Sequence, residues 1–222
     1  MRCLVAVALL ATLTAHGRVD RSEGLGAATG VVLDSSGSPL TDATVYALPA
    51  EDMTKQIRTT SDSSGHFTLE GIPAGAAYLD AYKETDGYPY NFFSFFKSPG
   101  ERTPAKVKIA AGKVTSNVVL RMGPKAAYLQ LDIANDDGTP VDGELSLDRP
   151  DIRGPYRRGV SAGELLMVPP VPFRLTFEAP GYLPWHYGGQ RWQGNEGLIR
   201  LKSGETLRVP IRLTHSSGRE GR

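Results

Sequence analysis

A turn pattern that occurs twice along the chain constrains the fold more than any other feature of the sequence. The β-branched and apolar run 28–34 is followed by Gly37-Ser38-Pro39, and the run 128–133 is followed by Gly138-Thr139-Pro140. Glycine and proline among Ser, Asp and Asn break regular structure and favour tight turns between strands. The spacing therefore predicts two copies of one strand-and-turn unit.

Later segments keep the order of this repeat. The paired segments are Gly65-His66-Phe67 with Gly163-Glu164-Leu165, Ile72-Pro73 with Val168-Pro169, Gly87-Tyr88-Pro89 with Gly181-Tyr182-Leu183-Pro184, and 109–112 with 201–204. Prolines and glycines at these positions oppose helices, and the apolar residues between them alternate with polar ones as in half-buried strands. We therefore expect an all-β protein.

Chain length supports two units rather than one. A sandwich of about seven strands takes about 100 residues, so 222 residues suit two of them. In the first copy we expect strands at 28–34, 43–48, 66–69, 78–82, 106–109 and 114–120, among about seven in all. The expected domains are residues 25–122 and 126–214, joined end to end by the short segment 123–125, with a disordered tail at 215–222.

The N-terminus predicts export. Met1 and Arg2 precede an apolar run from Cys3 to Leu13, which is typical of a signal peptide at residues 1–17. We expect cleavage after Gly17, with cleavage after Ala15 as the alternative. We expect a secreted or periplasmic protein without a membrane span in the mature chain, because no later segment has the required apolar length. The only cysteine, Cys3, leaves with the signal, so no disulfide is expected.

Charge argues against nucleic-acid binding. The chain has 25 Lys and Arg residues against 24 Asp and Glu residues, and loss of Arg2 with the signal leaves 24 of each. A protein that binds duplex nucleic acid usually carries a basic excess or stripe. Here the basic residues gather only at Arg153, Arg157 and Arg158, in a segment expected to be a loop.

The first copy resembles the carboxypeptidase regulatory-like family over residues 27–122. The residues that carry the resemblance are Gly30, Val32, Asp34, Gly37, Pro39, Leu40, Ala43, Ser61, Asp62, Gly65, Phe67, Leu69, Ile72, Pro73, Ala74, Gly75, Gly87 and Tyr88. The resemblance implies a seven-stranded Greek-key sandwich of the prealbumin-like or transthyretin-like kind, a fold also classed as carbohydrate-binding-like. It further implies an accessory role without catalysis.

The second copy departs from the family pattern. Asp62 has no clear counterpart near Ser161, and the proline-rich run 168–172 replaces Ile72-Pro73-Ala74-Gly75. We interpret residues 126–214 as a diverged copy of the same sandwich.

One motif is compatible with catalysis. Residues 159–163 match G-x-S-x-G, which in serine hydrolases places the nucleophile, here Ser161, on a turn from a strand to a helix. The following residues, 165–168, predict a strand, so we favour a plain turn and a protein that is not an enzyme. A serine hydrolase using Ser161 is the less favoured alternative.

Metal sites and cofactors are not predicted. His66, His186 and His215 have no metal-ligand spacing, and the acidic group Asp132, Asn135, Asp136 and Asp137 lacks the spacing of a known calcium loop. Asx-turn chemistry accounts for that group better.

The candidate ligand-binding residues are aromatic and follow each Gly-Tyr pair. One segment runs from Tyr88 to Phe96, and the other from Tyr182 to Tyr187 with Trp192 behind it; we select Tyr90, Phe93, Trp185, Tyr187 and Trp192. Aromatic faces in loops stack on sugar rings or bind a partner. The predicted function is therefore an exported accessory module that binds a glycan or an envelope protein. The alternative is a structural spacer whose aromatic residues fill a sandwich edge or the seam between the domains.

Overall fold

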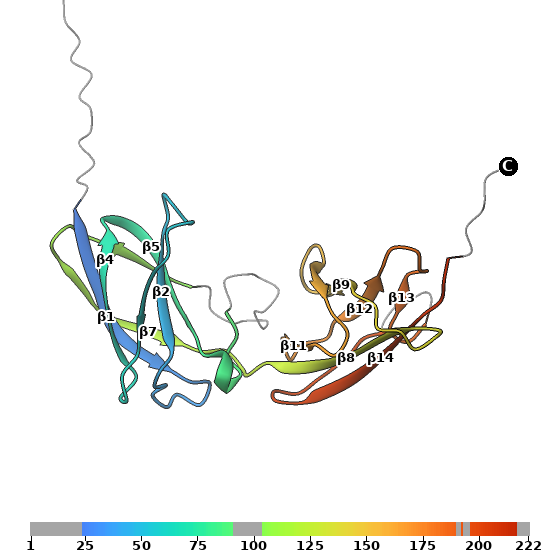
Figure 1. The fold of residues 1–222 in the computed structure, drawn as a ribbon. Coiled ribbons are helices and arrows are strands. Elements are labelled where there is room, and N and C mark those ends of the chain that lie inside the picture. The colour runs from blue at the N-terminus through green and yellow to red at the C-terminus, as the bar shows by residue number, and fades with distance from the viewer. Residues whose placement is uncertain (1–23, 91–103, 190–191, 193–195, 217–222) are drawn as a thin grey trace, which may run out of the picture.

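The computed structural model describes residues 24–90, 104–189, 192 and 196–216 (Figure 1). The first half contains β1 (Leu25–Leu33), β2 (Thr44–Pro49), β3 (Ile57–Thr60), β4 (His66–Pro73), β5 (Gly75–Tyr82), the short 3-10 helix η1 (Glu84–Asp86), β6 (Ala105–Ile109) and β7 (Val114–Arg121). The second half contains β8 (Ala127–Asn135), β9 (Gly143–Asp148), β10 (Tyr156–Val160), β11 (Leu165–Val168), β12 (Arg174–Glu178), β13 (Trp185–His186) and β14 (Thr206–Leu213). The predicted all-β class is confirmed.

Both halves have the same sheet topology. The first half has a three-stranded sheet in the order β4-β1-β7 and a four-stranded sheet in the order β3-β2-β5-β6. The second half has β11-β8-β14 and β10-β9-β12-β13, which is the same order strand for strand. In each half the first strand pairs antiparallel with the fourth and parallel with the seventh. The prediction of two tandem seven-stranded sandwiches is confirmed.

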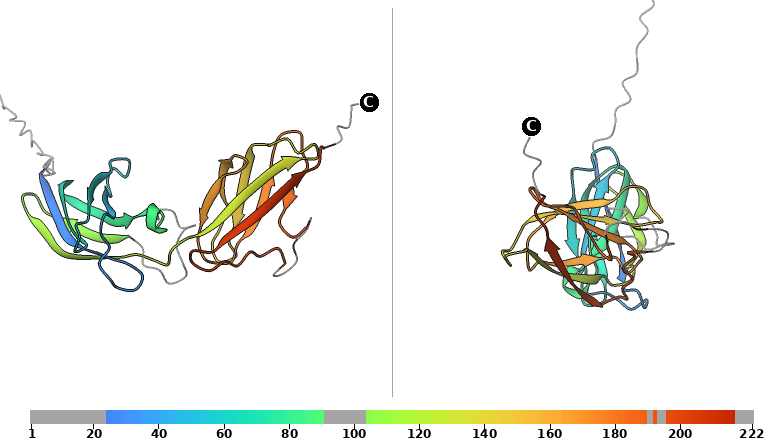
Figure 2. Two further views of the ribbon diagram at one scale, coloured as in Figure 1. Left: turned by 60° about the horizontal axis from the view of Figure 1, so that its bottom comes forward. Right: turned by 90° about the vertical axis from the view of Figure 1, so that its right-hand side faces the viewer.

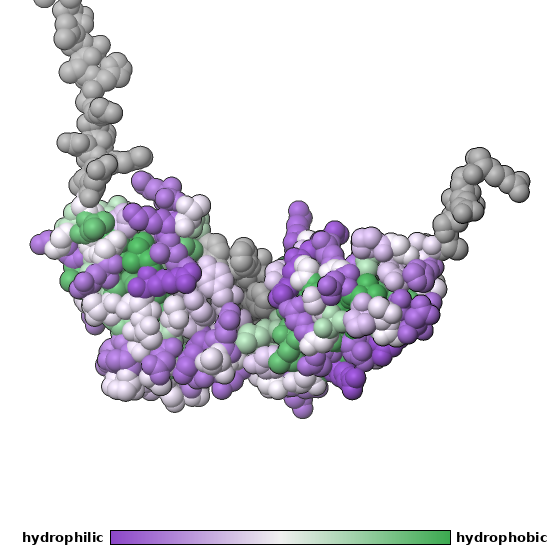
Figure 3. Space-filling model, viewed as in Figure 1, coloured by the Kyte–Doolittle hydropathy of each residue, from purple (hydrophilic) through white to green (hydrophobic). Residues whose placement is uncertain are grey.

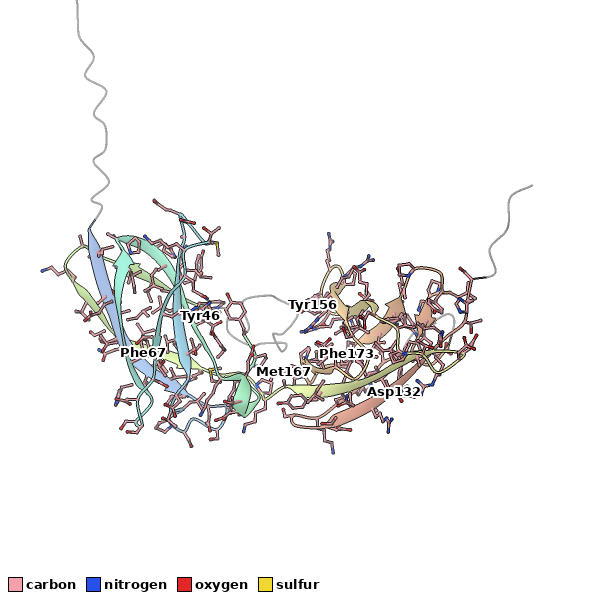
Figure 4. The ribbon with its side chains drawn as sticks, viewed as in Figure 1. Tyr46, Phe67, Asp132, Tyr156, Met167 and Phe173 are labelled. Atoms are coloured by element: carbon pink, nitrogen blue, oxygen red, sulfur yellow. The ribbon has the colours of Figure 1, made fainter. Side chains whose placement is uncertain are left out.

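Alternating burial explains why these segments form strands around two separate cores. On β5 the side chains of Ala77, Leu79 and Ala81 are buried and their neighbours are not, and on β12 Leu175 and Phe177 follow the same rule. Side chains that alternate between the faces of a strand bury every second residue against the opposite sheet. Figure 4 shows Phe67 within the first sandwich and Phe173 within the second, and each belongs to its own buried cluster.

The turn that defined the repeat has the same hydrogen bonds in both copies. A side-chain oxygen of Asp34 accepts the N–H groups of Ser36 at 2.8 Å and Ser38 at 2.9 Å. The amide oxygen of Asn135 accepts those of Asp137 at 3.1 Å and Thr139 at 2.8 Å. An Asx side chain thus holds each turn, through a carboxylate in one copy and a neutral amide in the other.

The structure corrects one pairing of the repeat. Because Asp34 and Asn135 hold equivalent turns, Ala28 corresponds to Leu129 and Thr29 to Gln130. Ala28 pairs with Leu69 and Leu129 with Leu166, whereas Thr29 pairs with Thr68 and Gln130 with Leu165. The buried Leu166 therefore corresponds to Leu69, and the exposed Leu165 corresponds to Thr68 rather than to Phe67.

The turns before these strands are closed alike but differ in backbone conformation. Gly65 donates its N–H to the Asp62 carbonyl at 2.9 Å, and Glu164 donates to the Ser161 carbonyl at 3.2 Å. The residue with positive φ is Gly65, the last of the first turn, but Gly163, the third of the second turn. Asp62 and Ser161 thus open corresponding but different turns.

Two edge strands were not predicted as strands. β3 is not among the strands expected from the sequence, and Arg157 and Arg158, which were expected in a loop, lie on β10. Among the described strands, β3 pairs with β2 alone and β10 with β9 alone. An edge strand can carry polar residues on both faces, so its sequence resembles that of a loop.

The last strand of the second sandwich is a protected edge. β14 pairs along its full length with β8, and its exposed residue Pro210 lies opposite Asp132. Proline has no N–H to offer to a further strand, which is a common protection against unwanted sheet extension. Beyond β14, Ser216 donates its N–H to the Gly181 carbonyl at 3.0 Å, so His215 and Ser216 are paired rather than part of a free tail.

The two sandwiches lie end to end, as expected from the short connection (Figures 1 and 2). Ala126 at the start of the second unit donates its N–H to the Gly87 carbonyl at 2.7 Å. The Lys125 ammonium lies 5.5 Å from the ring centre of the buried Tyr88. These contacts attach the connection to the segment that follows β5, so the junction is held by more than the chain itself.

Three predicted features fall wholly or partly outside the described residues. The signal peptide at 1–17 and residues 217–222 of the expected tail are outside them, as are Phe93 and the rest of 91–103. Within the described ranges, no helix has the length and apolar character needed to cross a bilayer.

A buried serine tests the first sandwich. The Ser61 hydroxyl accepts the Ala43 N–H at 2.9 Å and donates to the Leu40 carbonyl at 2.7 Å. Ser61→Ala leaves both backbone groups without this partner, so we expect a loss of about 1–3 kcal/mol in the free energy of unfolding. Both tryptophans, Trp185 and Trp192, lie in the second sandwich, so circular dichroism should show the loss while tryptophan fluorescence follows the other domain. Exposed Ser63→Ala is the control, and equal losses in both variants would contradict the assignment.

A second test concerns the junction. Gly87 has a φ of +86°, and a Cβ there would approach the Tyr128 hydroxyl to 3.3 Å and the Lys125 Cβ to 3.4 Å. Gly87→Val should push the units apart and increase inter-domain flexibility in small-angle X-ray scattering, with both sandwiches still folded. Gly112→Val is the matched control, since Gly112 also has a positive φ but a Cβ there would have no atom within 4 Å. Unchanged scattering from the Gly87 variant would show that this contact does not hold the junction.

Candidate functional site

Trp185 lies on a strand and not, as predicted, in a loop. Trp185 and His186 form β13, an edge strand that pairs Trp185 with Phe177 and His186 with Thr176 of β12. Phe177 is fully buried, whereas Thr176 is only half-buried. Because consecutive side chains of a strand point to opposite faces, Trp185 lies on the core side of this sheet and His186 on its outer side.

Tyr187 extends the core side of the same edge. Its N–H donates to the Leu175 carbonyl at 3.0 Å, which continues the pairing beyond β13. The Trp185 and Tyr187 rings lie 6.4 Å apart in an edge-to-face arrangement, and both pack against the core of the second sandwich. Both are half-buried, so they close the open edge of the sandwich while keeping part of their surface in solvent.

Trp192 belongs to the opposite face. Its indole N–H donates to the Tyr187 carbonyl at 2.9 Å, and its ring meets the His186 ring edge-to-face at 5.0 Å. The Arg174 guanidinium lies 5.6 Å from the centre of the Trp192 ring. The two tryptophans therefore flank one sheet on its two sides and do not form the single aromatic surface that the sequence suggested.

Tyr90 of the first sandwich is part of a tyrosine cluster. Its ring lies 5.0 Å from that of Tyr46 and 5.5 Å from that of Tyr82, and its hydroxyl accepts from the Gln56 side chain at 3.4 Å. Burial, followed by the nearby Asp80 carboxylate and the Tyr90 hydroxyl, raises the pKa of the Tyr46 phenol. The described contacts of Tyr90 are with Tyr46, Tyr82 and Gln56 of the first sandwich, where it acts as a packing residue.

Trp185 closes one edge of the second sandwich, and a groove runs along this edge. Its volume is about 370 Å³, and the residues lining it are Leu183, Pro184, Trp185, His186, Gly188, Gly189, Arg212 and Thr214. They come from β13, its flanking turns and the end of β14, where the edges of the two sheets approach each other. Leu183 is 48% exposed, so the groove combines accessible apolar surface with an aromatic wall. Among the described residues that line it, none is acidic.

The charge of the groove comes from Arg212. Arg212 and Arg208 of β14 both reach one carboxylate oxygen of Asp132 on β8, each at 3.1 Å. The hydrogen bond from Arg212 is the main cause that lowers the pKa of Asp132, and Arg208 adds to it against partial desolvation. One ionised carboxylate therefore faces two guanidinium groups, which leaves a surplus positive charge. Figure 4 shows Asp132 on the sheet that contains β8 and β14. In the view of Figure 3, small hydrophobic patches lie among hydrophilic residues.

The acidic residues considered for calcium do not converge. Asp132 points to the two arginines, and Asn135 uses its side-chain oxygen to hold the turn. Within the described ranges, no three His, Cys, Asp or Glu side chains are grouped as a metal site would require.

Ser161 lies in a turn between two strands. β10 ends at Val160 and β11 begins at Leu165, whereas a nucleophile elbow leads from a strand into a helix. The Ser161 N–H donates to the Glu164 carboxylate at 3.2 Å, and Arg158 pairs with the same carboxylate. These contacts stabilise a turn that connects the two sheets, and they engage the backbone N–H of Ser161 rather than its hydroxyl.

Trp185 was selected from the sequence as a candidate, whereas Arg212, which lines the same groove, was not. In the sequence, Arg212 is one of several polar residues that alternate with apolar ones in the last strand. Its place beside Trp185 depends on how the edges of the two sheets meet, which no local pattern reports.

A larger groove of about 820 Å³ lies at the start of the first sandwich. Small residues such as Gly24, Ala74 and Ala111 line it, together with the charged residues Glu51, Lys55 and Lys108. The described part of the lining contains no aromatic side chain. Because it borders residues 1–23, which lie outside the described part, we assign it no role.

Residues 27–115 match the model of the carboxypeptidase regulatory-like domain family, which confirms the resemblance in the first copy. The match ends before the second copy, which is related to the first by its strand order. A search of curated proteins finds no matching sequence.

The solved structures with similar arrangements have low sequence identity to this chain and low TM-scores. The Bacillus anthracis TIE protein has 13% identity and a TM-score of 0.35, with 86% of this chain and 34% of that chain covered. The leucine-rich repeat protein from Bacteroides thetaiotaomicron has 9% identity and a TM-score of 0.36, covering 85% and 27%. GBS52, the minor pilin of Streptococcus agalactiae, has 13% identity and a TM-score of 0.36, covering 89% and 99%. Likeness at this level transfers no role to the present chain.

The placement of Trp192 can be tested through Gly197. Gly197 has a φ of +66°, and a Cβ there would overlap the indole of Trp192. In a Trp185→Phe background, Gly197→Ala should displace the remaining indole and shift its fluorescence emission to longer wavelength. Gly204→Ala is the control, because Gly204 has a φ of +78° and a Cβ there would have no atom within 4 Å. Both changes carry a backbone cost of about 1–2 kcal/mol, so an equal emission shift would rule out the proposed contact.

Proposed function

We propose that this chain, whose residues 27–115 carry a carboxypeptidase regulatory-like domain, is an exported accessory protein without catalytic activity that binds a glycan. Binding would take place in the groove of the second sandwich, with Trp185 as the stacking residue. The observation that carries the proposal is the position of Trp185, which packs on the core and also lines an open groove.

The construction of the groove suits a sugar. An aromatic ring held by the core presents a rigid apolar surface, and binding sites combine such surfaces with a few polar groups that fix orientation. His186, Thr214 and Arg212 line the same groove as Trp185 and carry hydrogen-bonding groups. The volume of about 370 Å³ is in the usual range for small-ligand sites, which begins at about 300 Å³.

The absence of catalysis is part of the proposal. It is supported by the turn that holds Ser161 and by the contacts of His186, whose Nδ1 lies 3.2 Å from the Thr176 hydroxyl. Export is supported by the apolar N-terminal run.

A structural spacer is the second candidate. It is favoured by the hydrogen bond between Ala126 and Gly87, which ties the two sandwiches together, and by the packing of Tyr90 and Tyr187. A spacer requires a held junction but no accessible groove.

Glycan arrays followed by titration of the best ligand test the proposal. Trp185→Leu keeps apolar volume at the edge but removes the flat ring, so we expect the dissociation constant to rise about tenfold, which corresponds to about 1.4 kcal/mol. Trp192→Leu is the matched control, because that ring lies on the other face of the sheet. In the Trp192→Leu protein the remaining tryptophan is Trp185, so ligand should still change its fluorescence.

Two outcomes would contradict the proposal. One is the absence of binding to any glycan by folded protein, which would favour the spacer. The other is a Trp185→Leu protein that binds as tightly as the unmodified protein, which would place the ligand elsewhere.

A further inference from the structure

The groove has a positive charge that a neutral sugar would not need. Arg212 is the charged residue among those lining it, and its side chain is 54% exposed. The carboxylate that Arg212 reaches, Asp132, is shared with Arg208 at the same distance of 3.1 Å. Two cations on one anion leave about one unit of positive charge at the groove end of the cluster.

The geometry leaves part of the Arg212 guanidinium accessible. Its NH2 group donates to the Asp132 carboxylate, and its NH1 group donates to the Asp132 carbonyl at 2.8 Å and the Ile211 carbonyl at 3.2 Å. A guanidinium has five N–H donors in one plane, so these contacts fix its orientation without using all of them. The fixed side chain is thereby preorganised to bind a further oxygen anion.

Trp185 and Arg212 line the same groove from the edges of different sheets. Trp185 is on β13 of the four-stranded sheet, and Arg212 is on β14 of the three-stranded sheet. A ligand in the groove would therefore contact an aromatic ring on one side and a cation on the other. No acidic side chain in the described lining opposes a negative charge.

We propose that the ligand of this groove is an acidic glycan, with a sugar ring against Trp185 and an anionic substituent bound by Arg212. This inference rests on the proposed function and narrows it to one class of sugar. A carboxylate of a uronic acid and a sulfate ester both present the required oxygen anion.

The test uses matched oligosaccharides and the purified full chain. The probes are a uronic-acid tetrasaccharide, its methyl ester, the neutral tetrasaccharide with CH₂OH in place of each carboxylate, and an O-sulfated form of the neutral one. We expect the acidic forms to bind at least about tenfold more tightly than the neutral and esterified forms, which is the effect of one charged hydrogen-bonded contact. Comparison of the carboxylated and sulfated probes identifies the anion. Binding of the acidic probe by the unmodified protein should also weaken as salt is raised.

Arg208 provides a matched control for Arg212. Both arginines contact the Asp132 carboxylate at 3.1 Å, but only Arg212 lines the groove. Arg212→Gln should weaken binding of the acidic probe about tenfold and leave the neutral probe unchanged, whereas Arg208→Gln should have little effect on either. Equal losses in the two variants would assign the effect to the ion-pair cluster and overturn the inference.

The two proposals fail in different ways. Binding of the neutral probe as tight as that of the acidic probes, dependent on Trp185 but not on Arg212 or salt, would overturn the acidic specificity and leave glycan binding intact. Binding of no probe by the unmodified protein would overturn both. The salt and probe comparisons need no variant, so they decide the question even if an arginine variant fails to fold.

Discussion

Each sandwich depends on the pairing of its first strand. β1 and β8 are central strands that pair antiparallel with β4 or β11 and parallel with β7 or β14. Both strands bury alternate side chains in the core, such as Val32 in one and Leu131 in the other. Without disulfides after Cys3, this central pairing and the two apolar cores must supply the stability. The remaining strands complete sheets that the first strand organises.

The same pairing places the candidate groove. Because β14 lies beside β8, its outer edge faces the edge of the opposite sheet, where β13 carries Trp185. Asp132 projects from β8 to hold Arg208 and Arg212 of β14. The groove is thus formed at a boundary between two sheets, and its parts are supplied by strands far apart in sequence.

Much of the fold was predictable because local patterns carry it. The Gly-x-Pro turns and the alternation of apolar residues indicated the strands around Asp34 and Asn135, and hydrogen bonds confirm both turns. Edge strand β3 was less visible because its polar residues face solvent. The sequence pairs Gly163 with Gly65, one residue away from the pairing in the sheets, because the two turns place their positive-φ glycine differently relative to the strand that follows. Residue type alone does not report such a shift.

The site was predictable only in part. The aromatic residues in the sequence indicated Trp185. That Trp185 and Trp192 lie on opposite faces of the sheet follows from the position of Trp185 on β13, a strand of two residues. A strand this short shows no alternation of apolar and polar residues in the sequence. Arg212 lines the groove because the edges of two sheets lie next to each other there, which the sequence does not indicate. Phe93 lies outside the described residues.

The position of the closing strand also determines when each unit can be completed. The first sandwich has its seventh strand once residue 121 is available, whereas the second needs β14, which ends at Leu213 of 222 residues. A chain that emerges from its N-terminus can therefore finish the first unit while the second still exposes the edge of β8. Once β14 has paired with β8, Pro210 leaves the completed edge with one N–H fewer to offer to a neighbouring chain.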